Sequence, residues 1–348
     1  MHKDADQSHK NVPPTRDEAS LGALPVPGRR QVLTATALGA IAMTAPSLLG
    51  KRRAAAQTAE EPERDQELGD RELTGKTAFI TGGARGIGLA TAEELAKAGA
   101  NIVLYDVASR TLPHVPYPVA TESDLEQAKV QVEALGVRCL TFKGDVRDRE
   151  AQMRAMQEAV NTFGSLDIAV VNAGVSQAGA IEEFSSEEIS TVFEINVAGA
   201  VKTTQAAVSF MKPQGSGRII FISSALGRMG NELFSIYASS KWAMIGFAKS
   251  AALAYGQFNI LCNTVAPGLV DTPFADNDFI LSRMLPEAPN PTFEMVSEMS
   301  RSGSPIPVGH LDPIDVAKAV LFFAGSATDK VTGEVLDVSY GSLARSIA

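Results

Sequence analysis

The chain has 348 residues, of which 45% are hydrophobic and 29 are glycine, a composition that suits a well-buried α/β core. The formal net charge of −9, without any basic stripe, argues against a nucleic-acid-binding protein. Cys139 and Cys262 each lie in an apolar, strand-like run, where we expect buried thiols rather than a disulfide, and no Cys/His cluster has the spacing of a metal site.

Residues 1–56 are interpreted as an export leader. The paired Arg29 and Arg30 precede an uncharged run at 31–50, and small residues suited to a signal peptidase follow at 54–56. The run is too short and too weakly apolar to span a bilayer comfortably, so no stable membrane insertion is expected. The pattern resembles a twin-arginine signal, which delivers folded proteins to the periplasm. The alternatives are a disordered, Ala-rich extension of a cytoplasmic protein and an uncleaved membrane anchor.

Residues 57–72 are rich in charge and are expected to form a linker. From residue 73 onward, short apolar runs alternate with longer amphipathic stretches, which is typical of βαβ units. Strands are expected at 77–81, 101–106, 138–145, 166–174, 217–224, 259–268 and 335–338, and helices at 87–98, 122–135, 148–163, 186–212, 236–255 and 313–324. The sequence therefore predicts one α/β domain at 73–348, with a Rossmann-type, doubly wound sheet of seven mostly parallel strands.

A glycine-rich turn, TGGARGIG at 81–88, joins the first strand to the first helix. Gly82, Gly86 and Gly88 stand where a strand turns sharply, lets its backbone approach a pyrophosphate and packs a helix closely on the sheet. Asp106 ends the second strand eighteen residues after Gly88, as expected of a carboxylate that binds the adenosine ribose. Together these features predict a dinucleotide site rather than a simple tight turn.

Two charged residues bear on which dinucleotide binds. Asp106 would accept hydrogen bonds from the ribose hydroxyls and would repel the 2′-phosphate of NADP. Arg85, just before the second glycine, could instead pair with that phosphate. Because one arginine only partly offsets the repulsion by the carboxylate, NAD is favoured over NADP.

Tyr237 and Lys241 are four residues apart in YASSK, on one face of a predicted helix. A tyrosine normally ionises near pH 10, but an ammonium one turn away and a positive nicotinamide ring favour the phenolate and lower its pKa. Ser224 ends the preceding strand, thirteen residues before Tyr237, where its hydroxyl could orient a substrate oxygen. These residues are candidates for proton transfer to or from a substrate.

The motifs resemble the short-chain dehydrogenase/reductase family, in its single-domain branch with the longer cofactor motif. The resemblance covers 73–342 and rests on the order of TGGARGIG (81–88), Asp145 in GDV, NAG (172–174), Asn196 in INVAG, Ser224, YASSK (237–241) and APGLVDT (266–272). It implies an NAD-dependent oxidoreductase that acts on CH–OH groups and interconverts a secondary alcohol and a ketone. Where the family more often has paired glycines, this chain has Ser339-Tyr340-Gly341.

The resemblance also implies roles for the matching residues. Ser224 would polarise the substrate carbonyl, and Tyr237 would be the general acid or base. Lys241 would bind the nicotinamide ribose and tune Tyr237, while Asn196 would hold a water that links Lys241 to solvent. The residues expected to contact the cofactor are Gly82, Arg85, Gly86, Ile87, Gly88, Asp106, Asp145, Val146, Asn172, Ala173, Gly174, Tyr237, Lys241, Pro267, Gly268, Val270 and Thr272. Members of the family usually form tetramers or dimers through two long helices, so a homo-oligomer is expected.

Residues 107–121 form an insertion, because a helix usually follows the second strand within a few residues. Three prolines and Tyr117 make the insertion stiff. Its Pro-Tyr-Pro sequence resembles, more weakly, the mycofactocin-associated dehydrogenases that hold NAD without exchanging it. We therefore expect the insertion to cap the adenosine and retain NAD; a surface loop without such a role is the alternative.

Residues 274–311 carry little regular pattern and match the position of the family's variable substrate lid. Their Phe and Met side chains suit an apolar alcohol or ketone, although they could also only pack the lid onto the sheet. Two other functions remain open: an epimerase or dehydratase that uses NAD transiently, and a non-catalytic NAD-binding regulator. The complete set of Asn196, Ser224, Tyr237 and Lys241 favours a catalyst.

Overall fold

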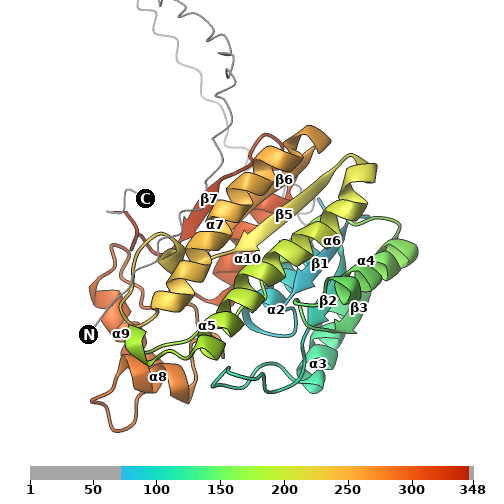
Figure 1. Cartoon of the computed structure of the whole chain (residues 1–348). Coiled ribbons are helices and arrows are strands. Elements are labelled where there is room, and N and C mark those ends of the chain that lie inside the picture. Colours follow the sequence, from blue (N-terminus) through green and yellow to red (C-terminus); the bar gives the residue numbers. More distant parts are fainter. Residues whose placement is uncertain (1–71, 345–348) are drawn as a thin grey trace, which may run out of the picture. The chain divides into compact units, whose positions relative to one another are not determined.

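The structure, a computed structural model, describes residues 72–344. The predicted leader and nearly all of the predicted linker lie outside the described residues. Within this range the chain forms one seven-stranded sheet, in the order β3-β2-β1-β4-β5-β6-β7, with every neighbouring pair parallel (Figure 1). The strands are β1 (Thr77–Thr81), β2 (Asn101–Asp106), β3 (Cys139–Lys143), β4 (Ile168–Val171), β5 (Gly217–Ile222), β6 (Ile260–Pro267) and β7 (Val335–Val338).

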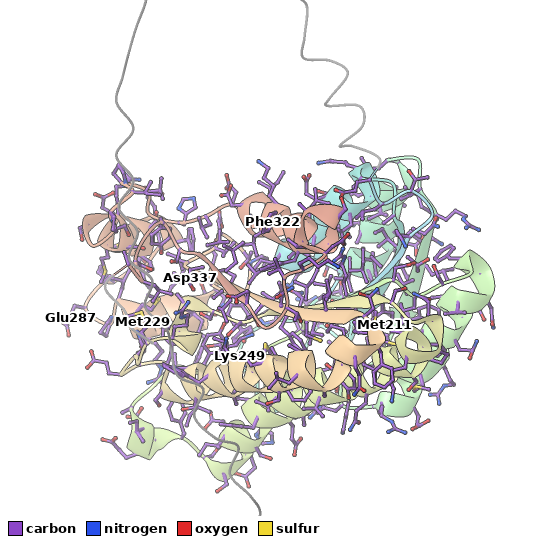
Figure 2. The ribbon with its side chains drawn as sticks, turned by 90° about the horizontal axis from the view of Figure 1, so that it is seen from above. Met211, Met229, Lys249, Glu287, Phe322 and Asp337 are labelled. Atoms are coloured by element: carbon purple, nitrogen blue, oxygen red, sulfur yellow. The ribbon has the colours of Figure 1, made fainter. Side chains whose placement is uncertain are left out.

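Helices cover both faces of this sheet. The α-helices within 72–344 are α2 (Gly86–Lys97), α3 (Glu122–Glu133), α4 (Arg149–Phe163), α5 (Ser186–Phe193), α6 (Gly199–Gln214), α7 (Ser235–Tyr255), α8 (Asp278–Met284), α9 (Phe293–Ser302) and α10 (Pro313–Ala324). Ile80 and Leu104 pack with α2, α3 and α10, whereas the alternate side chains of Phe79 and Val103 pack with α4, α6 and α7. From above, Phe322 of α10 and Lys249 of α7 lie on opposite sides of the sheet (Figure 2).

The strand order reverses between β1 and β4, and this reversal positions the site. Connections that leave these two strands diverge to opposite faces and open a crevice at their carboxyl ends. Hydrogen bonds tie the two strand ends together. Thr81 Oγ1 donates to the Val170 carbonyl oxygen at 3.3 Å, and Asn172 Nδ2 donates to the carbonyl oxygens of Thr81 at 2.9 Å and Gly82 at 3.0 Å. The crevice is therefore built on a fixed junction.

The predicted Rossmann-type α/β fold is confirmed, and the sheet is wholly parallel rather than mostly so. The helix expected at 186–212 is interrupted by a π-helical turn, Glu194–Ala198, between α5 and α6. The segment expected to be irregular, 274–311, contains α8 and α9. Asn277 and Thr292 start these helices as side-chain caps, but both helices are too short to show a clear helical period in the sequence.

Both cysteines are buried free thiols, as predicted. In the part of the chain that the structure describes, no helix is long and apolar enough to cross a membrane. Residues 72–344 also hold no group of three or more His, Cys, Asp or Glu side chains that could bind a metal ion.

Two valines on α3 test the packing of the core directly. Val132 is 0% exposed and Val130 is 60% exposed, so the same change removes buried methyl groups at one position and exposed ones at the other. We expect Val132→Ala to lower the free energy of unfolding by about 1–3 kcal/mol, because it removes two methyl groups from the core and leaves a cavity. Val130→Ala should change it by less than about 0.5 kcal/mol. Equal effects of the two variants in urea unfolding would contradict the packing described.

Candidate active site

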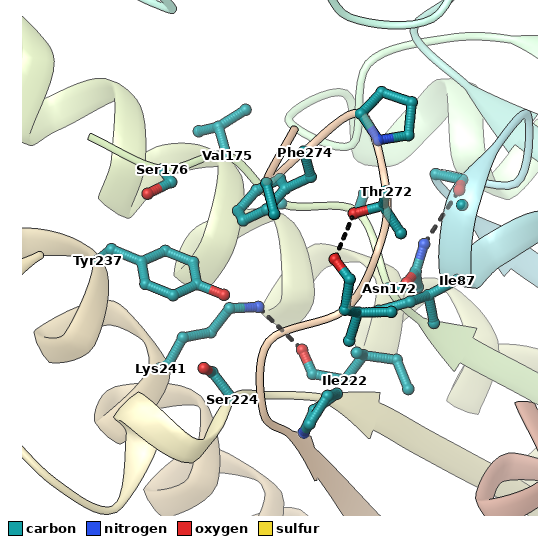
Figure 3. A pocket seen from close by; sticks show the side chains of 18 of the residues that line it. Ile87, Asn172, Val175, Ser176, Ile222, Ser224, Tyr237, Lys241, Thr272 and Phe274 are labelled. Carbon is teal, nitrogen blue, oxygen red and sulfur yellow. Dashed lines mark hydrogen bonds between the residues drawn. The ribbon is translucent and has the colours of Figure 1, made fainter. Parts of the chain in front are cut away.

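A cavity of about 440 Å³ opens at the carboxyl ends of the strands, between the loops that leave β1, β4, β5 and β6. Figure 3 shows Ser224, Tyr237 and Lys241 close together within it. The structure places every residue predicted for the site in the cavity lining except Gly88 and Asn196. The lining residues among the predicted set are Gly82, Arg85, Gly86, Ile87, Asp106, Asp145, Val146, Asn172, Ala173, Gly174, Ser224, Tyr237, Lys241, Pro267, Gly268, Val270 and Thr272.

The glycine-rich turn leaves its backbone open to a ligand. Gly82 and Gly86 have φ angles of +65° and +57°, a left-handed conformation that glycine adopts without strain. Gly88 has a packing role instead, because a Cβ there would lie 2.0 Å from the Gly82 carbonyl oxygen. The absence of that Cβ lets the amino end of α2 approach the turn. These features fit a dinucleotide, whose pyrophosphate would bind at the start of this helix.

Asp106 ends β2 beside this turn and is 7% exposed. Its carboxylate accepts hydrogen bonds from the backbone N–H groups of Ala84 and Ala108, both at 3.1 Å. Burial raises the pKa of Asp106, although these bonds and the charge of Arg85 oppose the shift. The Arg85 guanidinium donates to the Pro118 carbonyl oxygen at 2.6 Å, so the residue that could favour NADP is engaged by the insertion.

Asp145 and Val146 follow β3 and also line the cavity. The Arg147 guanidinium bonds the Asp145 carboxylate, with Nη2 2.6 Å from Oδ2. Burial raises the pKa of Asp145, but the bonds and charge of Arg147 outweigh it and leave the pKa below its usual value. An ionised carboxylate has several lone pairs, so Asp145 can bind Arg147 and still accept a hydrogen bond from an adenine amino group.

Tyr237 and Lys241 lie one turn apart on α7, both buried. The Lys241 ammonium is 5.5 Å from the centre of the Tyr237 ring, and it donates to the Ile222 carbonyl oxygen at 2.9 Å (Figure 3). Burial lowers the pKa of Lys241 to about 7. Ser224 stands at the end of β5, and interaction with its hydroxyl lowers the pKa of Tyr237, although burial dominates and raises it to about 12.

This result bears on one expectation. The sequence predicted that the neighbouring ammonium together with a positive nicotinamide ring would bring the pKa of Tyr237 down. In the protein alone the loss of water around the phenol has the larger effect, and the joint effect of the two charges stays a prediction. A fixed positive charge beside the phenol is still needed to make it a base near neutral pH. The nicotinamide ring, which was the second half of that expectation, is such a charge.

Asn196 lies in the π-helical turn and is 0% exposed. Its side-chain amide is bonded on both sides: Oδ1 accepts from Val175 N–H at 2.8 Å, and Nδ2 donates to the Val175 carbonyl oxygen at 2.8 Å and to Ser240 Oγ at 3.0 Å. Asn196 therefore fixes the chain just after the Asn172–Gly174 turn. The structure does not bring it into the cavity lining, and its expected contact with a relay water stays a prediction.

Several lining residues were not predicted from the sequence. Tyr340 packs its ring over Gly268, and its hydroxyl accepts a hydrogen bond from Leu269 N–H at 3.1 Å and bonds Ser300 of α9 at 2.8 Å. It thus ties the C-terminal segment to both the loop after β6 and the lid. Ser176, Met229, Asn231 and Phe234 also line the cavity, and no local motif marks them.

Comparison with known proteins identifies the family. The sequence profile of the short chain dehydrogenase family matches residues 76–279. An uncharacterized oxidoreductase of Mycobacterium tuberculosis (strain CDC 1551 / Oshkosh) is 36% identical over 277 residues, covering 78% of this chain and 97% of that protein. The (-)-trans-carveol dehydrogenase of Rhodococcus erythropolis is 31% identical over 276 residues, 78% of this chain and 98% of that protein.

A solved structure agrees with these relatives. The carveol dehydrogenase of Mycobacterium avium in complex with NAD matches with a TM-score of 0.76 and 33% sequence identity, over 78% of this chain and 99% of that one. The chain therefore belongs to the short-chain dehydrogenase family, whose members are oxidoreductases that act on small molecules.

The lowered pKa of Lys241 predicts how stability depends on pH. Between pH 7 and 10.5 the unfolded chain keeps a proton on this amine that the folded, cofactor-free protein loses, so the free energy of unfolding should rise with pH in this window. Lys241→Met removes the group and should flatten that rise between about pH 7.5 and 9.5. Lys249→Met, at an exposed lysine on the same helix, is the matched control. Urea unfolding at a series of pH values measures the slopes; parallel slopes for wild type and Lys241→Met would refute the burial effect.

Proposed function

We propose that this protein is an NAD-dependent dehydrogenase that interconverts a secondary alcohol and a ketone. One observation carries the proposal: a phenol, an ammonium and a serine hydroxyl converge in a cavity that also holds a dinucleotide-type glycine turn. A proton donor and acceptor beside a dinucleotide is the arrangement that hydride transfer from an alcohol requires. Relatives named as carveol dehydrogenases support the same reaction class.

The residues divide the chemistry between them. The Ser224 hydroxyl holds the substrate oxygen, and Tyr237 removes the alcohol proton as the carbon–oxygen bond becomes a carbonyl. In its protonated form Lys241 supplies positive charge beside the phenolate, and it would bind the ribose of the nicotinamide. Bound NAD would supply the acceptor for the hydride that leaves the same carbon. In the reverse direction Tyr237 returns the proton to the carbonyl oxygen.

NAD is proposed over NADP because a carboxylate, Asp106, stands at the cavity wall next to the glycine turn. A 2′-phosphate there would meet that charge, while Arg85 is bonded to the Pro118 carbonyl oxygen. The structure of the Mycobacterium avium carveol dehydrogenase contains NAD, which supports the same choice.

The substrate is proposed to be a small apolar alcohol or ketone. The apolar residues that line the cavity include Met229, Phe234, Phe274, Ile280 and Met284, and the ring of Phe274 packs on Tyr237. Such a lining favours a hydrocarbon body with a single hydroxyl or carbonyl group held by polar residues. We also propose a homo-oligomer, which the two long helices α6 and α7 would form as in the family.

Export by a twin-arginine signal and retention of NAD are proposed together. The leader residues that carry the signal lie outside the described range. The insertion at 107–121 supplies Val107, Leu112, Tyr117, Val119 and Ala120 to the cavity lining, which supports its predicted role as a cap over the cofactor. A folded enzyme that leaves the cytoplasm with NAD enclosed would need no external pool of the cofactor. The NADH formed in each oxidation would have to be reoxidised in the site by a second substrate or an external electron acceptor.

Tyr237→Phe tests the proposed mechanism. Removing the hydroxyl should lower kcat for NAD reduction by about 10²–10⁴-fold, because the proton acceptor is lost while the ring and its packing remain. Tyr255→Phe, at the other end of α7, makes the same change outside the cavity and should keep wild-type activity. The assay follows alcohol oxidation across a panel of secondary alcohols, with an external electron acceptor present to reoxidise NADH held in the site, so that turnover does not require the cofactor to leave. Undiminished activity in Tyr237→Phe would overturn the mechanism, and a wild type that binds NAD but oxidises nothing would favour a regulator.

Retention of NAD is tested on the protein as purified. After gel filtration, denaturation should release about one NAD per chain, and labelled NAD added to the native protein should not enter the site within hours. The measurement is mass spectrometry of the denatured supernatant. An empty site with rapid exchange of added NAD would show that the insertion does not retain the cofactor.

A further inference from the structure

The insertion is attached at several points rather than lying loosely over the cavity. Within it, backbone bonds join Arg110 N–H to the Ala120 carbonyl oxygen at 2.9 Å and Val119 N–H to the Arg110 carbonyl oxygen at 2.8 Å. Besides the bond from Arg85 to Pro118, Gln177 Nε2 donates to the His114 carbonyl oxygen at 2.5 Å. The insertion thus spans from the glycine turn to the segment after β4.

Tyr117 is the residue through which the insertion reaches the substrate side of the cavity. The residue is 5% exposed, and its hydroxyl accepts a hydrogen bond from Ser176 N–H at 2.7 Å and donates one to the Ser176 carbonyl oxygen at 3.3 Å. One hydroxyl therefore satisfies both backbone groups of a residue that lines the cavity. Burial also raises the pKa of Tyr117, so the hydroxyl keeps the proton that it donates.

The ring of Tyr117 contacts the substrate lid. It meets Phe274 edge-on, with ring centres 6.1 Å apart and planes at 74°, and it lies 6.4 Å from Phe279 of α8. Phe274 in turn packs on Tyr237, with ring centres 5.7 Å apart. A continuous aromatic row thus runs from the insertion, across the lid, to the phenol proposed to carry out proton transfer. Figure 3 shows Phe274 beside Tyr237 in this row.

We propose that Tyr117 is a positioning residue that fixes the lid through Phe274 and thereby makes the site selective for ring-shaped substrates. This inference rests on the proposed function, since it concerns how the same cavity chooses its alcohol. A wall of fixed aromatic rings packs well against a flat or cyclic hydrocarbon. A flexible straight chain gains less there, because it loses more conformational freedom when it is held.

The local stability of the lid is measured first, because this measurement does not depend on activity. Hydrogen exchange of residues 273–285 is compared in wild type, Tyr117→Leu, Tyr117→Phe and the control Thr111→Ala, at an exposed residue of the insertion outside the cavity lining. Tyr117→Leu should speed exchange of the lid about tenfold. Tyr117→Phe keeps the ring but loses the two bonds to Ser176, so it should speed exchange of the lid clearly less than Tyr117→Leu, and Thr111→Ala should stay near wild type. Unchanged lid exchange in Tyr117→Leu overturns the proposal. If that variant does not fold, Phe274→Leu removes the same contact from the lid side and is judged by the same criterion.

Selectivity is measured next, as kcat/KM for 4-methylcyclohexanol relative to 2-heptanol, two secondary alcohols of equal carbon number. Wild type should have the higher kcat/KM for the cyclic alcohol. In Tyr117→Leu the ratio of the two kcat/KM values should fall about tenfold, chiefly through a higher KM for the cyclic alcohol. Tyr117→Phe should retain the preference. An unchanged ratio in Tyr117→Leu refutes the selectivity role even if the lid has loosened. Absence of any NAD-linked oxidation by wild type would instead refute the proposed function, and lid exchange alone would then decide the role of Tyr117.

Discussion

The buried ammonium of Lys241 is the constraint on which the site depends. It is 3% exposed, it donates to the Ile222 carbonyl oxygen, and within residues 72–344 no carboxylate pairs with it. A charge in such surroundings is costly, so its pKa falls to about 7 and the amine can gain or lose its proton near neutral pH. The buried phenol of Tyr237 resists ionisation for the same reason. A charge placed beside the two groups therefore controls the protonation state of both.

The fold explains why that charge would come from a cofactor. The reversal of strand order between β1 and β4 creates the crevice, and the junction of Thr81 with Asn172 holds its two sides together. The glycine turn opens one half of the crevice to a pyrophosphate, and α7 brings its phenol and ammonium to the other half. The insertion and the lid meet above it through Tyr117 and Phe274, so a bound molecule would sit in a largely apolar enclosure. Low polarity there strengthens the electrostatic effects on which proton transfer depends.

Much of this could be predicted from the sequence because the information is local. The period of the apolar runs gives the strands and helices, the glycines mark a turn, and the spacing of Tyr237 and Lys241 places them on one face of a helix. The contact of Tyr117 with Ser176 spans 59 residues and depends on how the insertion folds back, which no local pattern records. Tyr340 was noticed only as a departure from the family, and its bonds to the loop after β6 and to α9 required the structure. The π-helical turn at Asn196 was likewise not predicted, because the apolar period of the sequence looked continuous across it.

In the proposed mechanism, the buried phenol of Tyr237 becomes a base only when positive charge lies beside it. The pH dependence of kcat/KM for alcohol oxidation by the NAD-loaded enzyme tests this most directly. We expect the rate to rise with an apparent pKa clearly below about 10, the value of an unperturbed tyrosine, although burial in the protein alone raises the pKa of Tyr237 to about 12. A rate that keeps rising beyond pH 11, or that does not depend on pH at all between about 6 and 10, would contradict it.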